Sequence, residues 1–234
     1  MKDVRSQIEL YVKEANYKEA LRLLFRLNTY EIKKWVYCYA IGQCYRFIGD
    51  LSNSIHFLED AKTLNPGCEE VTYALGSVYE LSLQYEQAIE AFKEVAAMNP
   101  DRIAAYNKIG LLHARSGRMQ EALVWYAKAL ERMGLLHVSH IWVQERTYTA
   151  LLRAKMEFSF AFPKKLEDAL NLEIQNMIIR NNIGVCYYEE GNYTIAKKWF
   201  SQSIASIPRG VDYGDPLVYM MMIEKVGSER SVGI

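Results

Sequence analysis

The chain has 234 residues, of which 50% are hydrophobic, and its 28 Lys and Arg residues balance its 28 Asp and Glu residues. The hydrophobic fraction excludes a disordered chain, and the balanced charge excludes a global positive field that would drive sequence-independent binding to nucleic acid or anionic lipid. Because the N-terminus lacks a signal peptide's apolar stretch and no window approaches the roughly 20 apolar residues that span a bilayer, we expect an intracellular protein, cytoplasmic or nuclear, with no membrane or nucleic-acid partner.

The chain repeats a pattern of residues with a period of 34. The first row, 1–34, fits loosely through Tyr11, Ala20 and Leu24 at row positions 11, 20 and 24. The clear rows carry an Ile-Gly or Leu-Gly pair at positions 7 and 8 and a large apolar or aromatic residue at position 24. These clear rows span 35–68, 69–102, 103–136 and 177–210. A fixed period of this length predicts stacked helical hairpins, each made of a helix A followed by a helix B.

Glycine recurs at position 8, in the middle of each predicted helix A. A glycine there costs about 1 kcal/mol relative to alanine, so close helix packing must offset that cost. We expect each glycine to face the small residue at position 20 of helix B, with larger side chains at positions 11 and 24 filling the gaps on either side. The glycines are Gly42, Gly76, Gly110 and Gly184, and the alanines at position 20 are Ala88, Ala122 and Ala196.

The ends of the helices also have sequence signals. Glycine at position 15 predicts that helix A ends in a left-handed residue. Asn65-Pro66 and Asn99-Pro100 predict the end of helix B, because proline disfavours helix in the residue before it. In the row 103–136, His113 replaces the tyrosine of position 11 and Gly134 replaces the proline. The glycines at position 15 are Gly49, Gly117 and Gly191.

The pattern breaks between residues 137 and 176, a stretch longer than one row. A regular row over 143–176 would place Pro163 inside helix B, where proline costs about 3 kcal/mol. We predict instead an irregular hairpin, with a long helix over roughly residues 139–160 and a shorter helix that begins near Pro163. This hairpin is either a decayed repeat without a role or a bend that shapes the array or contacts a partner.

A last helix is predicted over residues 215–226, where Asp215-Pro216 begins an apolar run rich in methionine. The terminal hairpin of a repeat array has no neighbour on its outer side, so a capping helix is expected there. We interpret the methionines as core filler rather than as an adaptable docking surface. Residues 227–234 are predicted to form a disordered tail.

The rows resemble the tetratricopeptide repeat family, and the matching positions cover most of residues 1–210. The resemblance implies an all-α fold, a right-handed superhelical solenoid of antiparallel helix pairs. We therefore expect residues 1–226 to form a single array in which each hairpin is stabilised by stacking on its neighbours.

Members of this family commonly hold an extended peptide or a partner helix on an inner, concave face, which helix A lines at positions 2, 5, 9, 12 and 13. Such a face in this chain combines aromatic area with hydrogen-bonding groups, which suits a peptide backbone. Alternatively, the same residues reflect helix solvation or packing against neighbouring helices. The candidate partner-binding residues implied by the resemblance are Tyr39, Gln43, Arg46, Tyr73, Ser77, Glu80, Asn107, Arg115, Asn181 and Tyr188.

The sequence contains no constellation of catalytic residues and no phosphate-binding loop. His137 and His140 are spaced three residues apart, but no cysteine or carboxylate pair with metal-ligand spacing lies near them. We therefore predict no enzyme activity, no cofactor and no metal site. The cysteines form no C-x-x-C pair, and we expect them to be reduced and buried. They are Cys38, Cys44, Cys68 and Cys186.

The leading hypothesis is a non-catalytic scaffold or adaptor that binds a protein or peptide partner in its concave groove. Chaperone-binding family members grip a C-terminal carboxylate with Lys, Asn and Arg at fixed positions, and this chain lacks that set. The alternative is a self-associating structural subunit of a larger assembly, resembling the repeat scaffolds of cell-cycle ubiquitin ligases, in which the ends of the array carry the contact. A homo-oligomer is therefore also possible.

Overall fold

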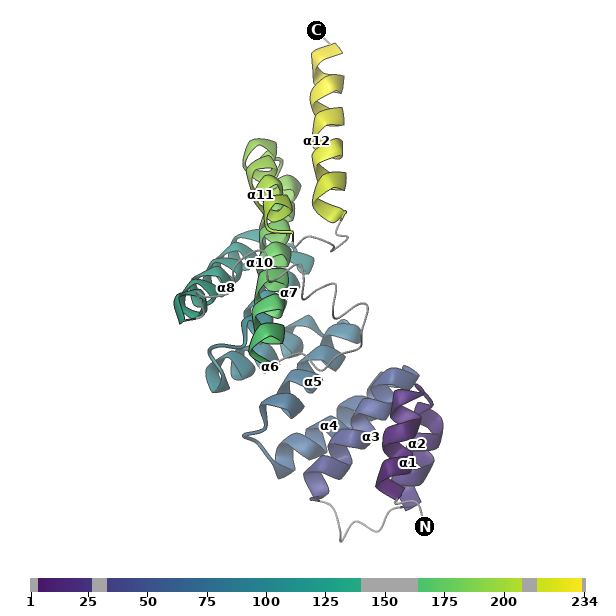
Figure 1. Ribbon diagram of the computed structural model, residues 1–234. Coiled ribbons are helices and arrows are strands. Elements are labelled where there is room, and N and C mark those ends of the chain that lie inside the picture. The colour runs from purple at the N-terminus through teal and green to yellow at the C-terminus, as the bar shows by residue number, and fades with distance from the viewer. Residues whose placement is uncertain (1–3, 27–32, 140–163, 208–213, 233–234) are drawn as a thin grey trace. The chain divides into compact units, whose positions relative to one another are not determined.

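The computed structural model describes residues 4–26, 33–139, 164–207 and 214–232, and within these ranges it contains helices and no strand. The chain divides into two compact units, Met1–Pro100 and Asp101–Ile234, which are described separately. The helices of the first unit are α1 (Val4–Lys13), α2 (Tyr17–Arg26), α3 (Lys34–Ile48), α4 (Leu51–Leu64), α5 (Glu69–Leu81) and α6 (Tyr85–Met98) (Figure 1). Those of the second unit are α7 (Ile103–Arg115), α8 (Met119–Ser139), α10 (Lys164–Glu189), α11 (Tyr193–Ala205) and α12 (Asp215–Val232).

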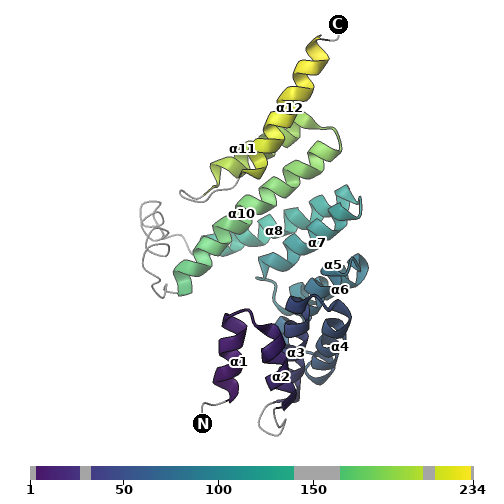
Figure 2. The same ribbon diagram turned by 90° about the vertical axis from the view of Figure 1, so that its right-hand side faces the viewer.

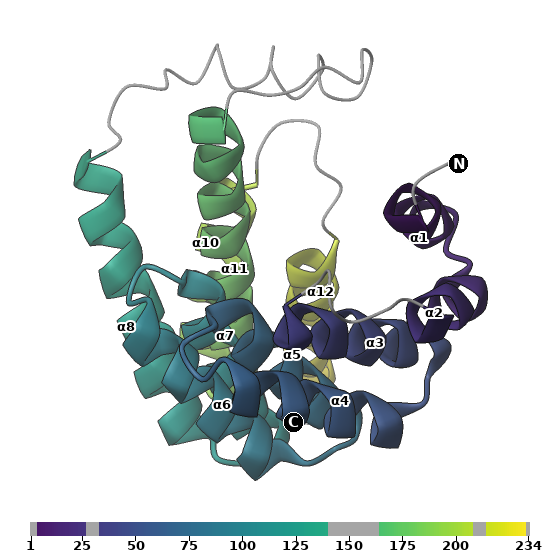
Figure 3. The same cartoon turned by 90° about the horizontal axis from the view of Figure 1, so that it is seen from below.

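Each clear row folds into a hairpin of two helices. In the first unit, consecutive helices contact one another from α1 to α6, and Figure 3 shows α1 beside α2 and α3 beside α4. In the second unit, α7 packs on α8, and α10 lies between α8 and α11 (Figure 2). The predicted all-α arrangement of helix pairs is confirmed.

The turns between helix A and helix B share one backbone conformation at row position 15. Gly49, Gly117 and Gly191 have φ angles of 91°, 74° and 75°, which confirms the predicted left-handed ends. Ala15 and Leu83 hold the same row position with φ angles of 54° and 61°, although neither is glycine. The shared conformation at Ala15 also supports the register of the loosely matching first row.

The glycines at position 8 pack differently from the sequence prediction. A Cβ atom added to Gly110 or Gly184 would first meet the ring of the residue at position 24, at 2.6 Å from Tyr126 Cε1 and 2.5 Å from Phe200 Cε1. In these two rows the atoms nearest to the glycine therefore belong to position 24 and not to the predicted position 20. The large side chain at position 24 lies directly against the glycine, and it needs that space because both of these rings are almost completely buried.

Position 20 instead supports the hairpin through the backbone in the row 35–68. There the residue is Ser54, which is fully buried and donates a hydrogen bond from its hydroxyl to the Gly42 carbonyl at 2.8 Å. Because Gly42 has no side chain, a second helix can come close enough to reach that carbonyl oxygen. The glycine therefore serves both the side chain at position 24 and the one at position 20.

The irregular region differs from the prediction in the part that the structure describes. Helix α10 begins directly after Pro163, as predicted, but it continues without a break to Glu189 and so includes helix A of the row 177–210. The residues from Lys164 to Ile183 contain neither proline nor glycine, so nothing interrupts the helix before Gly184. The predicted long helix over residues 139–160 lies almost wholly outside the described residues.

Two other helices run past their predicted ends. Helix α8 continues through Gly134 to Ser139, because this row lacks the proline that ends helix B elsewhere. Helix α12 continues past residue 226 to Val232, where a disordered tail was predicted. Gly227 costs the helix only about 1 kcal/mol, and the residues after it include the helix formers Glu229 and Arg230.

Candidate functional site

The candidate site in the first unit is the helix A face of α3 and α5, which contact each other. At position 5 of the two rows stand Tyr39 and Tyr73, both half-buried. Tyr39 packs against two groups of core residues, one around Cys38 and one around Leu58. Tyr73 meets the Phe92 ring edge to face, with ring centroids 5.2 Å apart. Each tyrosine thus has part of its surface in the core and part on the face.

Polar groups on this face are held by their own helix. Gln43 Oε1 accepts a hydrogen bond from Arg46 Nε at 2.8 Å, and the Arg46 guanidinium carbon lies 4.3 Å from the centroid of the Phe47 ring. Ser77 donates its hydroxyl proton to the Tyr73 carbonyl at 2.9 Å. These contacts fix the side-chain directions, so the groups that remain accessible are oriented before any partner arrives.

The sequence prediction missed two apolar residues at position 13 of the same helices. Phe47 is 52% exposed and Leu81 is 55% exposed. The Phe47 ring stacks on Tyr17 with centroids 4.5 Å apart, which anchors it in place. Their recurrence at one row position was the sequence signal that could have found them.

Two of the predicted site residues are buried. Glu80, at position 12, is 8% exposed, and Asn181, at position 5, is 4% exposed. Asn181 lies on α10, which packs against both α8 and α11. Neither side chain is available to touch a partner in this conformation.

In the second unit, an amide pair connects the helix A faces of α7 and α10. Asn182 Nδ2 donates a hydrogen bond to Asn107 Oδ1 at 3.1 Å. Asn182 also shares a hydrogen bond with Tyr126, whose pKa is raised by burial. Asn182 directly follows the predicted Asn181 in sequence, and it is Asn182 that forms the hydrogen bond to Asn107.

Arg115 and Tyr188 lie near the ends of the same two helices. Arg115 is the last residue of α7 and is exposed. Tyr188 is half-buried, and its ring contacts Tyr193 at 5.4 Å and Tyr219 at 5.2 Å between centroids. Tyr188 therefore joins α10 to α11 and α12 as well as contributing to the face.

Reactive groups are sparse in the part of the chain that the structure describes. No cluster of three or more His, Cys, Asp or Glu side chains there could hold a metal ion. The four cysteines are free and buried, as predicted, and burial raises the pKa of Cys186 to about 11. His113 is buried among core residues, while His140 lies outside the described residues. Among the helices described, none is both long and apolar enough to cross a membrane.

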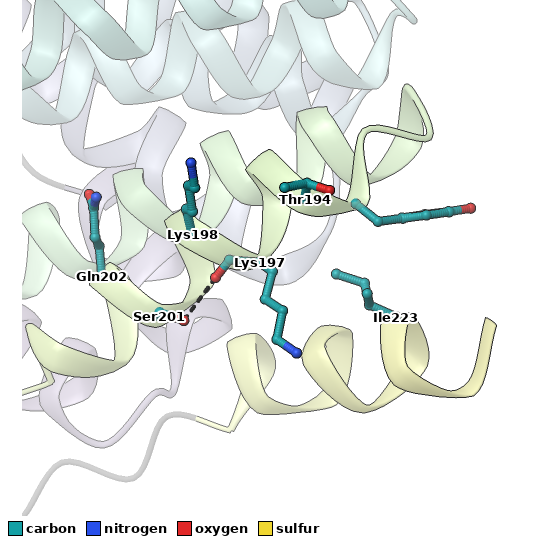
Figure 4. A pocket seen from close by; sticks show the side chains of 7 residues that line it. Thr194, Lys197, Lys198, Ser201, Gln202 and Ile223 are labelled. Atoms are coloured by element: carbon teal, nitrogen blue, oxygen red, sulfur yellow. Dashed lines mark hydrogen bonds between the residues drawn. The ribbon is translucent and has the colours of Figure 1, made fainter. Parts of the chain in front are cut away.

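An open hollow of about 560 Å³ lies between α11 and α12. Figure 4 shows that Lys197 and Lys198 point to opposite sides of α11, so their charges do not converge on a ligand. Lys197 instead forms an ion pair with Glu224 at 3.4 Å, and the Ser201 hydroxyl donates to the Lys197 carbonyl at 2.9 Å. The hollow is a seam between two packed helices rather than a built binding site.

The repeat assignment is tested by comparison with known families. Two family models described as tetratricopeptide repeat match the chain, one over residues 73–134 and one over residues 36–68 and 179–209, together more than half of its length. The chain belongs to the tetratricopeptide repeat family. Proteins of this family are typically non-catalytic and bind other proteins.

Several proteins of known name are similar to this tetratricopeptide repeat chain. BBSome complex member BBS4 of Bos taurus is 24% identical over 229 residues, which cover 88% of this chain and 41% of that protein. The peroxisomal targeting signal 1 receptor of Dictyostelium discoideum is 42% identical over 72 residues, which cover 30% of this chain and 11% of that protein. The chain therefore spans less than half the length of these relatives.

Solved structures with the same fold include the MamA proteins. A crystal structure of MamA matches with a TM-score of 0.62 at 18% identity and covers 87% of this chain and 89% of that chain. MamA from Desulfovibrio magneticus RS-1 matches with a TM-score of 0.63 at 16% identity and covers 87% of this chain and 92% of that chain. At this level of identity the match confirms the fold.

Proposed function

We propose that the chain is a non-catalytic scaffold that binds a peptide or partner segment on the helix A faces of its units. The observation that carries the proposal is the pair of exposed apolar residues, Phe47 and Leu81, at one row position of adjacent helices. Each lies eight residues after a half-buried tyrosine, Tyr39 or Tyr73, of the same helix. Aromatic and apolar side chains that are already held in place lose little conformational entropy when a partner binds, so they make effective anchors.

The second unit supplies complementary polar groups. The amide pair uses one donor of Asn182 and one acceptor of Asn107, and Asn182 also shares a hydrogen bond with Tyr126, whereas an asparagine side chain carries two donors and two acceptor lone pairs. The remaining capacity suits the N–H and C=O groups of an extended peptide. Arg115, exposed at the end of α7, adds a positive charge that would favour an acidic residue in the partner.

The proposal is tested by quantitative pull-down from a native lysate. We expect Leu81→Lys to remove specific partners, because a charged group would replace an apolar anchor. Leu64→Lys is the matched control: Leu64 is also the last residue of its helix, is 44% exposed, and lies on helix B. Lysine is favoured at a helix C-terminus, so both variants should fold.

A second pair of variants examines the other unit in the same experiment. Arg115→Glu should weaken capture of an acidic partner, and Arg132→Glu, which changes an exposed arginine of helix B, should not. If both site variants captured the same proteins in the same amounts as their controls, the helix A faces would not be the binding surface.

A further inference from the structure

Helix α12 exposes apolar side chains at row positions that the clear rows bury. Counting on from the row 177–210 places Leu217, Val218 and Met221 at positions 7, 8 and 11. In all four clear rows, the residues at positions 7 and 8 are buried. In α12, Leu217 is 47% exposed, Val218 is 55% exposed, Met221 is 68% exposed and the adjacent Met222 is 44% exposed. The prediction that the methionines are core filler is therefore wrong for Met221 and Met222.

In a complete hairpin, this face of helix A is covered by helix B. A Cβ at Gly110 or Gly184 would collide with Tyr126 of α8 or Phe200 of α11, which shows how closely helix B approaches position 8. No helix of the described residues covers α12 in this way, and Figures 1 and 2 show its C-terminal half extending beyond α10 and α11. Within the described residues, this face of α12 is therefore not covered by a second helix.

The opposite side of α12 is already in use. Tyr219 stacks on Phe200 with centroids 5.2 Å apart and an interplanar angle of 13°, and Pro216 is buried. Glu224 forms the ion pair with Lys197. Residues three, four and seven apart share one side of a helix, so Pro216, Tyr219 and Ile223 form the docked side. The exposed side defined by Leu217, Val218, Met221 and Met222 points away from it.

We propose that the exposed side of α12 binds a second copy of the chain, with two α12 helices antiparallel about a two-fold axis. Antiparallel pairing is the arrangement that helices A and B adopt in every hairpin, so each α12 would take the place of helix B for the other. Two-fold dimers use one self-complementary patch. The four apolar residues of the exposed side, Leu217, Val218, Met221 and Met222, are of similar size and lie near the middle of the patch. In the dimer they would pack against the same four residues of the other copy.

Two features favour a second copy over a different partner. Position 8 holds Val218 instead of glycine, so α12 leaves no space for a large aromatic ring from the helix that covers it. Side chains of similar size on two α12 helices can instead interdigitate at the usual distance between helix axes of about 8–10 Å. Asp215 lies at the start of the patch and Lys225 near its other end. In an antiparallel pair, Asp215 of one copy therefore meets Lys225 of the other at both ends, and opposite charges coincide.

The dimer is tested by sedimentation of the full chain from about 1 to 200 µM, a range suited to a small interface. We expect the mass to rise from 27.1 kDa toward twice that value with concentration. Met221→Lys should weaken dimerisation at least tenfold, because two like charges would meet near the two-fold axis. Leu64→Lys, the control on α4, should leave it unchanged. A monomer at every concentration, or a dimer that tolerates Met221→Lys, would overturn the proposal.

Exchanging the charges of residues 215 and 225 tests whether the two α12 helices pair in the antiparallel direction. Asp215→Lys and Lys225→Asp should each weaken the dimer, and the double variant should restore it, because the opposite charges would again face each other. Lysine at the N-terminus of α12 destabilises the helix equally in Asp215→Lys and in the double variant. Recovery of the dimer in the double variant therefore cannot be caused by recovered helix stability. Failure of the double variant to recover would rule out this pairing. The candidate partner-binding residues on α3, α5, α7 and α10 take no part in the contact, so the proposed function can hold or fail independently.

Discussion

Helices α10 and α12 belong to the same unit and hold equivalent places in successive rows, yet their outer environments differ. In α10, Gly184 lies under the Phe200 ring of α11, and both residues are buried. In α12, Val218 holds the same row position and is 55% exposed. The difference shows that glycine at position 8 answers a steric requirement of a covering helix, and that an uncovered helix A has no such requirement.

The largest expected effect comes from giving α10 the residue of α12. Gly184→Val should lower the free energy of unfolding by about 3 kcal/mol, because its Cβ alone would lie 2.5 Å from Phe200 Cε1 and the added methyl groups would force the ring out of its position. Urea denaturation followed by far-UV circular dichroism measures the change.

The reverse exchange serves as the control. Val218→Gly removes an exposed side chain from α12, so it should cost only about 0.5 kcal/mol through the loss of helix propensity. Equal losses for the two variants would contradict the idea that the covering helix sets the requirement for glycine.

A smaller effect, of opposite sign, is expected at the turn between α5 and α6. Leu83 has a φ angle of 61°, whereas the equivalent turns before α4, α8 and α11 use glycine. The left-handed conformation costs a residue with a Cβ roughly 1–2 kcal/mol, so Leu83→Gly should raise the free energy of unfolding by about 1 kcal/mol after the entropy cost of glycine. Leu83→Ala retains the Cβ and should give no such gain, which thermal melting of the two variants would check.

The hairpin of α10 and α11 should also lose stability at alkaline pH. Burial first, and then the nearby Glu190 carboxylate, raise the pKa of Cys186 from 9.0 to about 11. The unfolded chain therefore releases this proton before the folded chain does, so the contribution to stability is complete below about pH 9 and is lost as the pH rises through 11. Cys186→Ala should lose less stability over that window in denaturation measured at several pH values.

The smallest effect is expected at Gly76. A Cβ there would lie 3.1 Å from Phe92 Cε1, a looser contact than at Gly184, and the ring is already tilted against Tyr73. The gain in helix propensity of about 1 kcal/mol should nearly cancel the crowding, so Gly76→Ala should change the free energy of unfolding by less than about 0.5 kcal/mol. If Gly76→Ala lost as much stability as Gly184→Val, the distance between the added Cβ and the ring would not determine the loss of stability.

The candidate site was only partly readable from the sequence. Row register placed Tyr39, Tyr73 and Asn107 on helix A at the positions where the structure has them half-exposed. It did not predict that Asn181 is buried while the adjacent Asn182 is half-buried, because adjacent residues on a helix point about 100° apart and their burial depends on which neighbouring helix is present. Phe47 and Leu81 were not among the predicted candidates, although they hold position 13 of the same helices.

The sequence by itself determined the period, the helix pairs, the left-handed turns at position 15 and the buried cysteines, because these depend on local backbone preferences and on the helical spacing of apolar residues. Only the tertiary structure decided that position 24 covers the glycine at position 8 and that α12 remains uncovered. The reason is physical: a helical pattern defines an apolar face, but whether that face is buried depends on a second segment that lies elsewhere in the chain or in another molecule.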